Sequence, residues 1–364
     1  MKIVAEAGTS YEGSLDKAKL LVECAKECGA DCVKFQWVYA DEILHPRTGL
    51  VHLPTGDIPL YERFRQLEVN PDFFATLRDF CRNVGIEFMC SPFGLKSLTE
   101  LLQIEPDYIK IASPELNYVQ LLKKLKQENT KNIPVVLSSG VSKLHDIENA
   151  VSIFENSEIL KKNNLTLLHC ITSYPAPEEE YNLNLICSLH SIFGIPTGIS
   201  DHSLNPLYVP LLAQALEATM LEKHITLDNE GSGLDDPVAL NPKNFKLMCQ
   251  TVKEFSKADD VRDYTISYLQ NQIGDKVIKI LGNGIKKLAP SEEKNYGRTN
   301  RSLRFIKDKK CGEKIEKDDI AILRTEKILE VGLEPKFLDD IIGSRLTKDV
   351  ISGDAVNWAC LTTK

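Results

Sequence analysis

The sequence contains no apolar run that approaches the roughly 18 residues of a membrane-spanning helix. It also has no excess of basic residues, because 44 lysines and arginines face 52 aspartates and glutamates, for a formal net charge of −8. The N-terminus carries no basic region ahead of its first apolar segment, as a secretory signal would. These absences argue against a membrane, secreted or nucleic-acid-binding protein, so we expect a soluble, cytoplasmic one.

No C-x-x-C pair occurs among the ten cysteines, although Cys24, Cys28 and Cys32 recur every four residues. Cys24 and Cys28 would share one face of a helix, and Cys32 opens the next apolar segment. Free thiols in a reducing compartment commonly pack as small buried hydrophobes. The cysteines therefore predict core positions rather than a metal site or disulfides.

The chain of 364 residues suits a barrel of about 250 residues followed by a small appendage. Short apolar segments alternate with amphipathic helical stretches. The expected strands are 3–5, 32–35, 86–89, 108–111, 135–137, 165–168, 197–199 and 220–222. Eight strands that are apolar enough to be buried on both faces predict an α/β fold, a closed parallel (β/α)8 TIM barrel. The long stretch between Trp37 and Asn70 is expected to pass over the barrel mouth.

Polar side chains follow nearly every expected strand. The carboxyl ends of barrel strands meet at one mouth, where the chemistry of such barrels is built. A ring of buried polar groups is explained better by a charged ligand than by packing. In chain order the ring contains Glu6, Lys34, Gln36, Ser91, Lys110, Ser113, Glu115, Ser138, Ser139, His169, Thr172, Tyr174, Ser200, Asp201, His202, Glu222, Lys223 and His224. The sequence thus predicts an active site at this mouth.

Two lysines, Lys34 and Lys110, stand on strands that are expected to lie inside this mouth. A buried cation without a counter-charge destabilises a fold. The hydroxyls expected beside the lysines are those of Ser113, Ser138, Thr172 and Ser200. Lysines and hydroxyls together would form a cradle for a small dianion or trianion such as a phosphorylated carboxylate. The alternative is that the lysines pair with neighbouring Glu6 or Glu115.

Two histidines, His202 and His224, end consecutive expected strands and could converge on one side of the barrel. Paired neutral imidazoles near carboxylates suit a divalent transition metal. The alternative is that these histidines only make hydrogen bonds. His169 is the substitute metal ligand if one of the two does not bind the metal.

Several motifs in chain order carry a resemblance to a known family. They are E-A-G-T-S-Y-E-G (6–13), A-D-C-V-K-F-Q (30–36), Y-I-K-I-A-S-P-E (108–115), L-S-S-G (137–140), H-C-I-T-S-Y-P-A-P (169–177), G-I-S-D-H-S (198–203) and L-E-K-H-I-T-L-D (221–228). Together they resemble the N-acetylneuraminate (sialic acid) synthase family. The segment from Arg301 to Cys360 resembles the C-terminal antifreeze-like domain of that family, so the resemblance covers essentially the whole chain.

The resemblance implies a function and a set of site residues. It implies an enzyme that condenses phosphoenolpyruvate with an N-acetylated amino-hexose, N-acetylmannosamine or a related diacetamido sugar, to form a nonulosonic acid with release of phosphate. The positions that match the phosphoenolpyruvate site are Lys34, Lys110, Ser113, Ser138, Thr172 and Ser200. The catalytic positions are Glu6, Glu115, His202 and His224, of which the two histidines would hold a divalent metal, manganese first, with magnesium or cobalt as alternatives. The positions that face the sugar are Gln36, Tyr174, Asp235 and Arg324, together with Glu115.

Three motifs depart from the pattern of the family. Its N-H-N-G reads Ser10-Tyr11-Glu12-Gly13, its S-G-E reads Ser113-Pro114-Glu115, and its G-P-D-H reads Gly233-Leu234-Asp235-Asp236. All three departures lie toward the sugar rather than toward phosphoenolpyruvate. N-acetylmannosamine, its 6-phosphate and trideoxy-diacetamido hexoses therefore all remain open as acceptors.

The expected domains are a barrel over 1–258, a linker over 259–290 and an antifreeze-like lid over 291–364. In the family this lid belongs to the partner subunit and contributes an arginine to the sugar, and Arg324 is the match by position. The resemblance therefore implies a domain-swapped homodimer whose barrels are closed in trans. The alternative for Arg324 is an ordinary charge at a strand edge.

Two other functions compete with this interpretation. A synthase of the 3-deoxy-octulosonate or arabino-heptulosonate phosphate type performs the same condensation on a phosphorylated aldose, but the antifreeze-like tail argues against it. A catalytically inactive sugar-binding homologue is suggested by the altered loop at 10–12, whereas the retained histidines and lysines argue for an enzyme.

Overall fold

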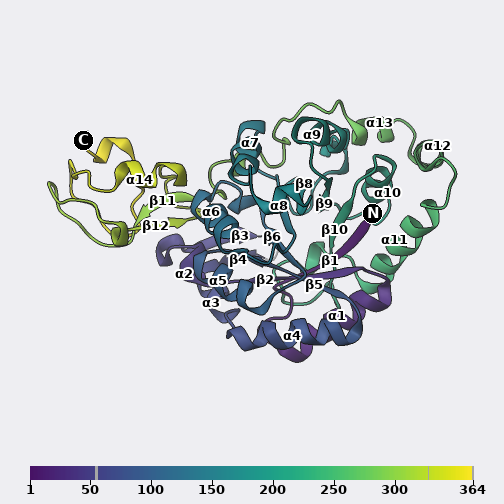
Figure 1. The fold of residues 1–364 in the computed structure, drawn as a ribbon, viewed down its shortest axis with the longest axis horizontal. Coiled ribbons are helices and arrows are strands. Elements are labelled where there is room, and N and C mark those ends of the chain that lie inside the picture. The colour runs from purple at the N-terminus through teal and green to yellow at the C-terminus, as the bar shows by residue number, and fades with distance from the viewer. Residues whose placement is uncertain (54–55, 327, 363–364) are drawn as a thin grey trace.

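The structure is a computed structural model that describes residues 1–53, 56–326 and 328–362 (Figure 1). Eight parallel strands close into a barrel in the order β1-β10-β9-β8-β7-β6-β5-β2. They are β1 (Lys2–Gly8), β2 (Cys32–Trp37), β5 (Glu87–Pro92), β6 (Tyr108–Ile111), β7 (Val135–Ser138), β8 (Leu165–Cys170), β9 (Thr197–Asp201) and β10 (Met220–His224). The TIM barrel and all eight expected strands are confirmed, and no strand end differs from its predicted position by more than three residues.

An outer layer of helices surrounds the barrel. Its members are α1 (Leu15–Cys28), α4 (Pro71–Val84), α5 (Leu95–Ile104), α6 (Val119–Glu128), α7 (Leu144–Ile153), α9 (Leu185–Phe193), α10 (Tyr208–Ala215) and α11 (Pro242–Phe255), with the short α8 (Glu158–Lys161) after α7. In α4 the Asn70 side chain accepts from the backbone N–H of Phe73, and Pro71 occupies the first helical position. The buried residues Phe73, Phe74, Leu77 and Cys81 lie on one face at helical spacing.

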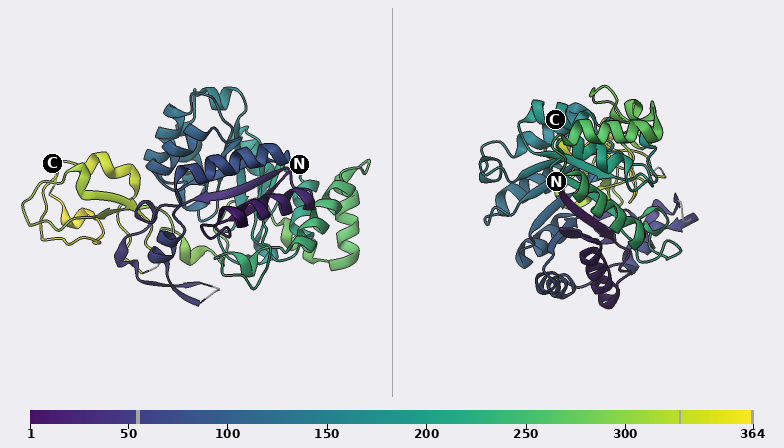
Figure 2. Two further views of the ribbon diagram at one scale, coloured as in Figure 1. Left: turned by 90° about the horizontal axis from the view of Figure 1, so that it is seen from below. Right: turned by 90° about the vertical axis from the view of Figure 1, so that its right-hand side faces the viewer.

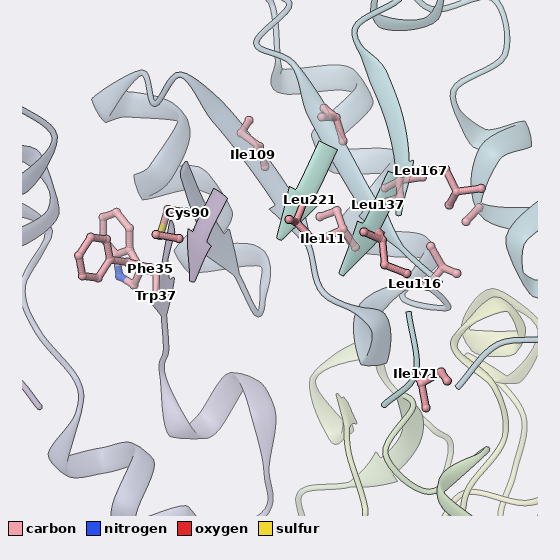
Figure 3. Packing of buried hydrophobic residues seen from close by; sticks show 14 of the residues in the cluster. Phe35, Trp37, Cys90, Ile109, Ile111, Leu116, Leu137, Leu167, Ile171 and Leu221 are labelled. Atoms are coloured by element: carbon pink, nitrogen blue, oxygen red, sulfur yellow. The ribbon is translucent and has the colours of Figure 1, made fainter. Parts of the chain in front are cut away.

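The core is layered in the way that strand alternation requires. Outward-facing strand residues such as Phe35, Leu137 and Leu221 pack beneath the helices, as Figure 3 shows for part of this cluster. A second cluster fills the barrel interior below the mouth, and its buried members are Val4, Cys32, Met89, Val136, Leu168 and Met220. The polar residues of the mouth therefore stand on a closed apolar floor. All ten cysteines are free thiols, as predicted, and seven of them are buried.

The stretch between β2 and α4 forms a small structure of its own. It contains α2 (Ala40–Ile43), an antiparallel hairpin of β3 (Leu50–Leu53) and β4 (Gly56–Pro59), and α3 (Leu60–Gln66). Its apolar side chains, among them Leu60 and Phe64, form a separate cluster with Phe93 from the loop after β5. Because Leu60 and Phe64 line the cavity at the mouth, the predicted excursion over the mouth is confirmed.

The segment expected as a linker is largely helical. It contains α12 (Val261–Ile273) and α13 (Lys276–Leu281), and α12 packs against α10 and α11. Leu269, Val277 and Ile280 are fully buried in the main core. Only the part after Leu281 is an extended connection, because the earlier residues present apolar side chains that dock onto the barrel.

The C-terminal module, residues 301–362, projects from one side of the barrel (Figures 1 and 2). It is built on an antiparallel pair, β11 (Ser302–Phe305) and β12 (Ile320–Leu323), with α14 (Leu338–Ile341) and several single-turn helices. It contacts the barrel through β12 against α2 and through Pro335–Phe337 against α6. In the described part of the chain, the helices are all too short or too polar to span a bilayer.

Candidate active site

A cavity of about 530 Å³ opens at the carboxyl ends of the barrel strands. The predicted site residues that line it are Glu6, Lys34, Gln36, Lys110, Ser113, Ser138, Thr172, Tyr174, Ser200, His202, His224, Asp235 and Arg324. Glu115 is fully buried and touches Arg324 of the cavity wall. The structure thus brings together residues that lie more than 300 positions apart in the sequence.

Glu222 is the electrostatic centre of the site. Its Oε1 lies 3.0 Å from Lys34 Nζ and 3.2 Å from Lys110 Nζ, and it accepts a 2.9 Å hydrogen bond from Ser200 Oγ. Lys34 also lies 3.3 Å from Glu6. The alternative pairing of a lysine with Glu6 is therefore found for Lys34, whereas Lys110 pairs with Glu222 and not with Glu115.

The buried charges shift one another's pKa values. Burial raises the pKa of Glu6 to about 7, although Lys34 acts in the opposite direction. Burial alone would also raise the pKa of Glu222, but Lys110 and Lys34 hold it below its usual range. Burial lowers the pKa of Lys34, and the carboxylates of Glu222 and Glu6 more than offset this, so the net pKa is raised. Glu222 is therefore a fixed anion, while Glu6 can exchange a proton near neutral pH.

Several polar atoms around the lysines have no hydrogen-bond partner within the described residues. They include Ser91 Oγ, Ser138 Oγ and Thr172 Oγ1. Leaving a buried hydroxyl unsatisfied costs about 1–3 kcal/mol, so three of them beside two cations indicate a missing acceptor. Gly140 permits this arrangement, because a Cβ there would lie 2.2 Å from Thr172 Oγ1. The mouth can therefore hold a small anion with several oxygens.

His202 and His224 converge as predicted, with ring centroids 5.4 Å apart. His202 Nδ1 lies 2.6 Å from the carbonyl oxygen of Ile171 and donates to it, so Nε2 is the ring nitrogen that remains for a ligand. Burial lowers the pKa of His202, but Cys170, the Ile171 carbonyl and Glu222 more than offset this, so the net pKa is raised. Burial, with the nearby His202 and Lys34, holds the pKa of His224 well below its usual range, so its ring is neutral. Tyr174 stacks on the His202 ring at a centroid distance of 4.2 Å.

His202 and His224 are the residues that would hold a divalent metal. Neutral imidazoles are the form that binds metal. Among residues 1–53, 56–326 and 328–362 no cluster of three or more metal-binding side chains occurs, so further ligands would be substrate or water. His169, the predicted substitute, instead contacts the carbonyl oxygen of Tyr181 at 2.6 Å.

Two arginines of the C-terminal module hold Glu115. Arg301 Nε and Nη2 lie 3.1 and 2.9 Å from Glu115 Oε1, and Arg324 Nε donates to the same oxygen at 3.0 Å. Arg324 is therefore a site residue and more than a strand-edge charge. The sequence analysis missed the role of Arg301, which is 1% exposed, because its partner lies 186 positions away. The prediction has Arg324 reach the sugar bound by the other chain, whereas in the single chain Arg324 contacts Glu115 of its own barrel.

Two of the three motifs that depart from the family pattern, 10–13 and 233–236, contact each other. Ser10 Oγ donates to Asp236 Oδ1 at 2.7 Å, and Thr226 Oγ1 donates to the same atom at 2.8 Å. Glu12 bridges to Arg63 of α3 at 2.8 Å. These contacts anchor the loop that carries Asp235, whose Oδ2 lies 3.7 Å from His224 Nδ1. The altered motifs thus build one wall of the site.

Another part of the cavity wall is apolar. Leu60, Phe64, Phe93 and Leu234 line it, and the Arg324 guanidinium lies 5.1 Å from the centre of the Phe93 ring. The cavity therefore has a charged inner half and an amphipathic outer half, which suits two substrates of different polarity.

A closed parallel barrel with a polar, charged cavity at the carboxyl ends of its strands is the arrangement of an enzyme active site. The chain belongs to the NeuB family, whose profile matches residues 21–263. It is 33% identical over 356 residues to an uncharacterized protein of Methanocaldococcus jannaschii, covering 98% of this chain and 93% of that one. It is 31% identical to the N,N'-diacetyllegionaminic acid synthase of Campylobacter jejuni, covering 95% of this chain and 96% of that one. The crystal structure of spore coat polysaccharide biosynthesis protein SpsE from Bacillus subtilis has a TM-score of 0.79 at 29% identity and covers 100% of this chain and 95% of that one.

Proposed function

We propose that the protein condenses phosphoenolpyruvate with an N-acetylated amino-hexose to form a nonulosonic acid and releases phosphate. The observation that carries this proposal is the cradle of Lys34 and Lys110, with three hydroxyls that have no partner among the described residues, beside the His202–His224 pair. Membership of the NeuB family supports it, as do the relatives named as legionaminic and pseudaminic acid synthases.

The reaction joins C3 of phosphoenolpyruvate to C1 of the open-chain sugar, adds water at C2 and expels phosphate. Lys34 and Lys110 would hold the phosphate and carboxylate, and the hydroxyls would donate to their oxygens. A divalent metal on His202 and His224, manganese by resemblance, would supply Lewis-acid stabilisation of the aldehyde oxygen. Glu6, with its pKa raised to about 7, can hold or release a proton beside the reacting carbons.

The outer half of the cavity supports an N-acetylated acceptor. Leu60, Phe64 and Leu234 can pack against acetamido methyl groups, while Asp235, Gln36 and the Glu115–Arg324 pair offer partners to hydroxyls and amides.

Product analysis tests the proposed function. Purified protein with manganese and phosphoenolpyruvate is incubated with a panel of acceptors: N-acetylmannosamine, its 6-phosphate, 2,4-diacetamido-trideoxy hexoses and arabinose 5-phosphate. Mass spectrometry should find a nine-carbon 2-keto acid with an N-acetylated acceptor, together with phosphate release. A product from arabinose 5-phosphate alone would favour the octulosonate type, and no product with any acceptor would favour an inactive sugar-binding protein.

Lys110→Met should weaken phosphoenolpyruvate binding by about 2–4 kcal/mol, because one cation of a desolvated charge cluster is lost. Isothermal titration calorimetry on the free enzyme measures this directly. Lys123→Met, a change of an exposed lysine on α6, is the matched control and should bind normally. An unchanged affinity for Lys110→Met would mean that other groups hold the anion.

We further propose that the protein is a cytoplasmic homodimer and that its C-terminal module is the antifreeze-like domain that the sequence resembles. In such a dimer, Arg301 and Arg324 of one subunit would contact Glu115 in the barrel of the other subunit. In the single chain they contact Glu115 of their own barrel. The extended connection after Leu281 is the place where such an exchange would occur.

Subunit mixing tests this exchange. Lys110→Met carries a defective barrel and Arg324→Ala a defective module, and each is expected to be inactive alone. After random exchange of equal amounts, half the dimers are mixed and half of their sites contain neither defect, so activity should rise toward one quarter of wild type. No recovery despite proven exchange would show that each module serves its own barrel.

A further inference from the structure

A strap of residues 286–300 crosses the barrel mouth between the outer helices and the C-terminal module. Its side chains contact the backbone of the loops that follow β7 and β8. Lys286 Nζ donates to the carbonyl oxygen of Ser139 at 3.2 Å, and Asn295 Nδ2 donates to that of Thr172 at 3.1 Å. These loops carry Ser138 and Thr172 of the anion cradle, so the strap lies directly behind it.

Glu292 makes the central contact of the strap. Its Oε2 accepts hydrogen bonds from the backbone N–H of Val141 at 2.9 Å and of Thr172 at 2.8 Å. Its Oε1 accepts from the N–H of Ala289 at 3.3 Å. The side chain is 1% exposed and lies outside the lining of the cavity. One buried carboxylate therefore joins the ends of two neighbouring strands.

Val141 is held in a conformation that it would not adopt alone. Its φ of +42° lies in the left-handed region, which is costly for a β-branched residue, by about 1–3 kcal/mol. Glu292 fixes its N–H, and Asn300 Nδ2 donates to its carbonyl oxygen at 3.2 Å. Glu292 and Asn300, the two residues that hold the backbone of Val141, both belong to the strap.

The strained residue directly follows the tightest part of the cradle. Gly140 donates its N–H to Ser113 Oγ at 3.0 Å, and its Cα packs against Thr172 Oγ1. A change of φ at Val141 would move Gly140, and with it the hydroxyls of Ser113 and Thr172. The geometry of the anion cradle therefore depends on a carboxylate that does not touch the anion.

We propose that Glu292 is a positioning residue for the phosphoenolpyruvate cradle, acting through the N–H groups of Val141 and Thr172. The naming of the anion rests on the proposed function, whereas the role of Glu292 rests on the contacts alone. The strap continues directly into Arg301 of the C-terminal module, and Arg301 contacts Glu115 on the sugar side of the cavity. The position of the C-terminal module therefore affects the anion cradle, through Glu292, as well as the part of the cavity that faces the sugar.

Three variants separate geometry from charge. Glu292→Ala removes all three hydrogen bonds, including those to Val141 and Thr172, and should weaken binding of phosphoenolpyruvate and of inorganic phosphate at least tenfold in calorimetry. Glu292→Gln keeps an acceptor oxygen for Val141 and Thr172 and should stay within about threefold of wild type. Glu293→Gln changes the exposed neighbour on the same strap and is the matched control. In kinetics, Glu292→Ala should raise the KM for phosphoenolpyruvate far more than the KM for the sugar.

A rescue experiment distinguishes a positioning role of Glu292 from a general contribution to stability. It measures whether a second substitution restores anion affinity. Adding Val141→Gly to Glu292→Ala removes the cost of the left-handed conformation, so the double variant should recover part of the lost affinity. If Glu292→Ala does not fold, the shorter Glu292→Asp, which cannot reach both N–H groups, serves the same comparison.

Two outcomes would overturn the proposal: an anion affinity of the alanine or aspartate variant equal to that of wild type, or a loss that Val141→Gly does not relieve. A wild-type protein that binds inorganic phosphate but not phosphoenolpyruvate would instead contradict the proposed function, and the phosphate arm would still test Glu292.

Discussion

His224→Ala should abolish turnover, with kcat falling by roughly three orders of magnitude, the scale of several kcal/mol of lost charge stabilisation. The His224 ring is neutral, lies 5.4 Å from that of His202 and faces the cavity, so it is suited to hold a metal and not to support the core. The barrel should stay folded, because the apolar floor beneath the mouth is untouched. Steady-state kinetics check the loss of turnover, and calorimetry with manganese checks the loss of metal binding.

The control for this variant is His145→Ala, which removes a histidine whose side chain is 59% exposed on α7. It should leave both kcat and manganese binding unchanged. If His224→Ala kept near-normal activity after chelation and addition of manganese, the histidine pair would have another role. His202→Ala should behave as His224→Ala does, because each ring would supply one of the two protein ligands.

The barrel could be predicted because each of its strands is a local apolar segment with a polar residue at its end. The same periodicity placed Glu222 in the polar ring at the mouth, but its role as the counter-charge of the two lysines was not predicted. Glu222 precedes His224 by two positions and therefore faces the same side of β10. Since His224 was expected to face the mouth, alternation alone places Glu222 there, beside two lysines that required a counter-charge.

The contacts of Glu292 and Arg301 could not be predicted in this way. Glu292 accepts hydrogen bonds from residues 120 and 151 positions away, and Arg301 pairs with a carboxylate 186 positions away. Neither residue lies in a periodic segment, because the strap is an irregular connection. Their partners are fixed by the path of the strap across the mouth, which depends on the packing of α12 and α13, the helices that the sequence analysis took for a linker.

Glu222→Gln should destabilise the free protein strongly, with a loss of about 3–5 kcal/mol in the free energy of unfolding. The reason is that Lys34 and Lys110, both nearly fully buried, share the Oε1 atom of Glu222 as a counter-charge. A neutral amide can still accept the hydrogen bond from Ser200, but it leaves the two cations facing each other with only Glu6 nearby. Chemical denaturation measures the loss.

Phosphoenolpyruvate should restore much of this stability, because its phosphate and carboxylate bring the missing negative charge into the same cradle. The rise in melting temperature on addition of saturating phosphoenolpyruvate should therefore be larger for Glu222→Gln than for wild type. Glu230→Gln, an exposed change in the loop after β10, should match wild type in both measurements. A Glu222→Gln protein as stable as wild type would show that the lysines do not depend on this carboxylate. An equal ligand-induced shift in both proteins would show that the anion does not take over its charge.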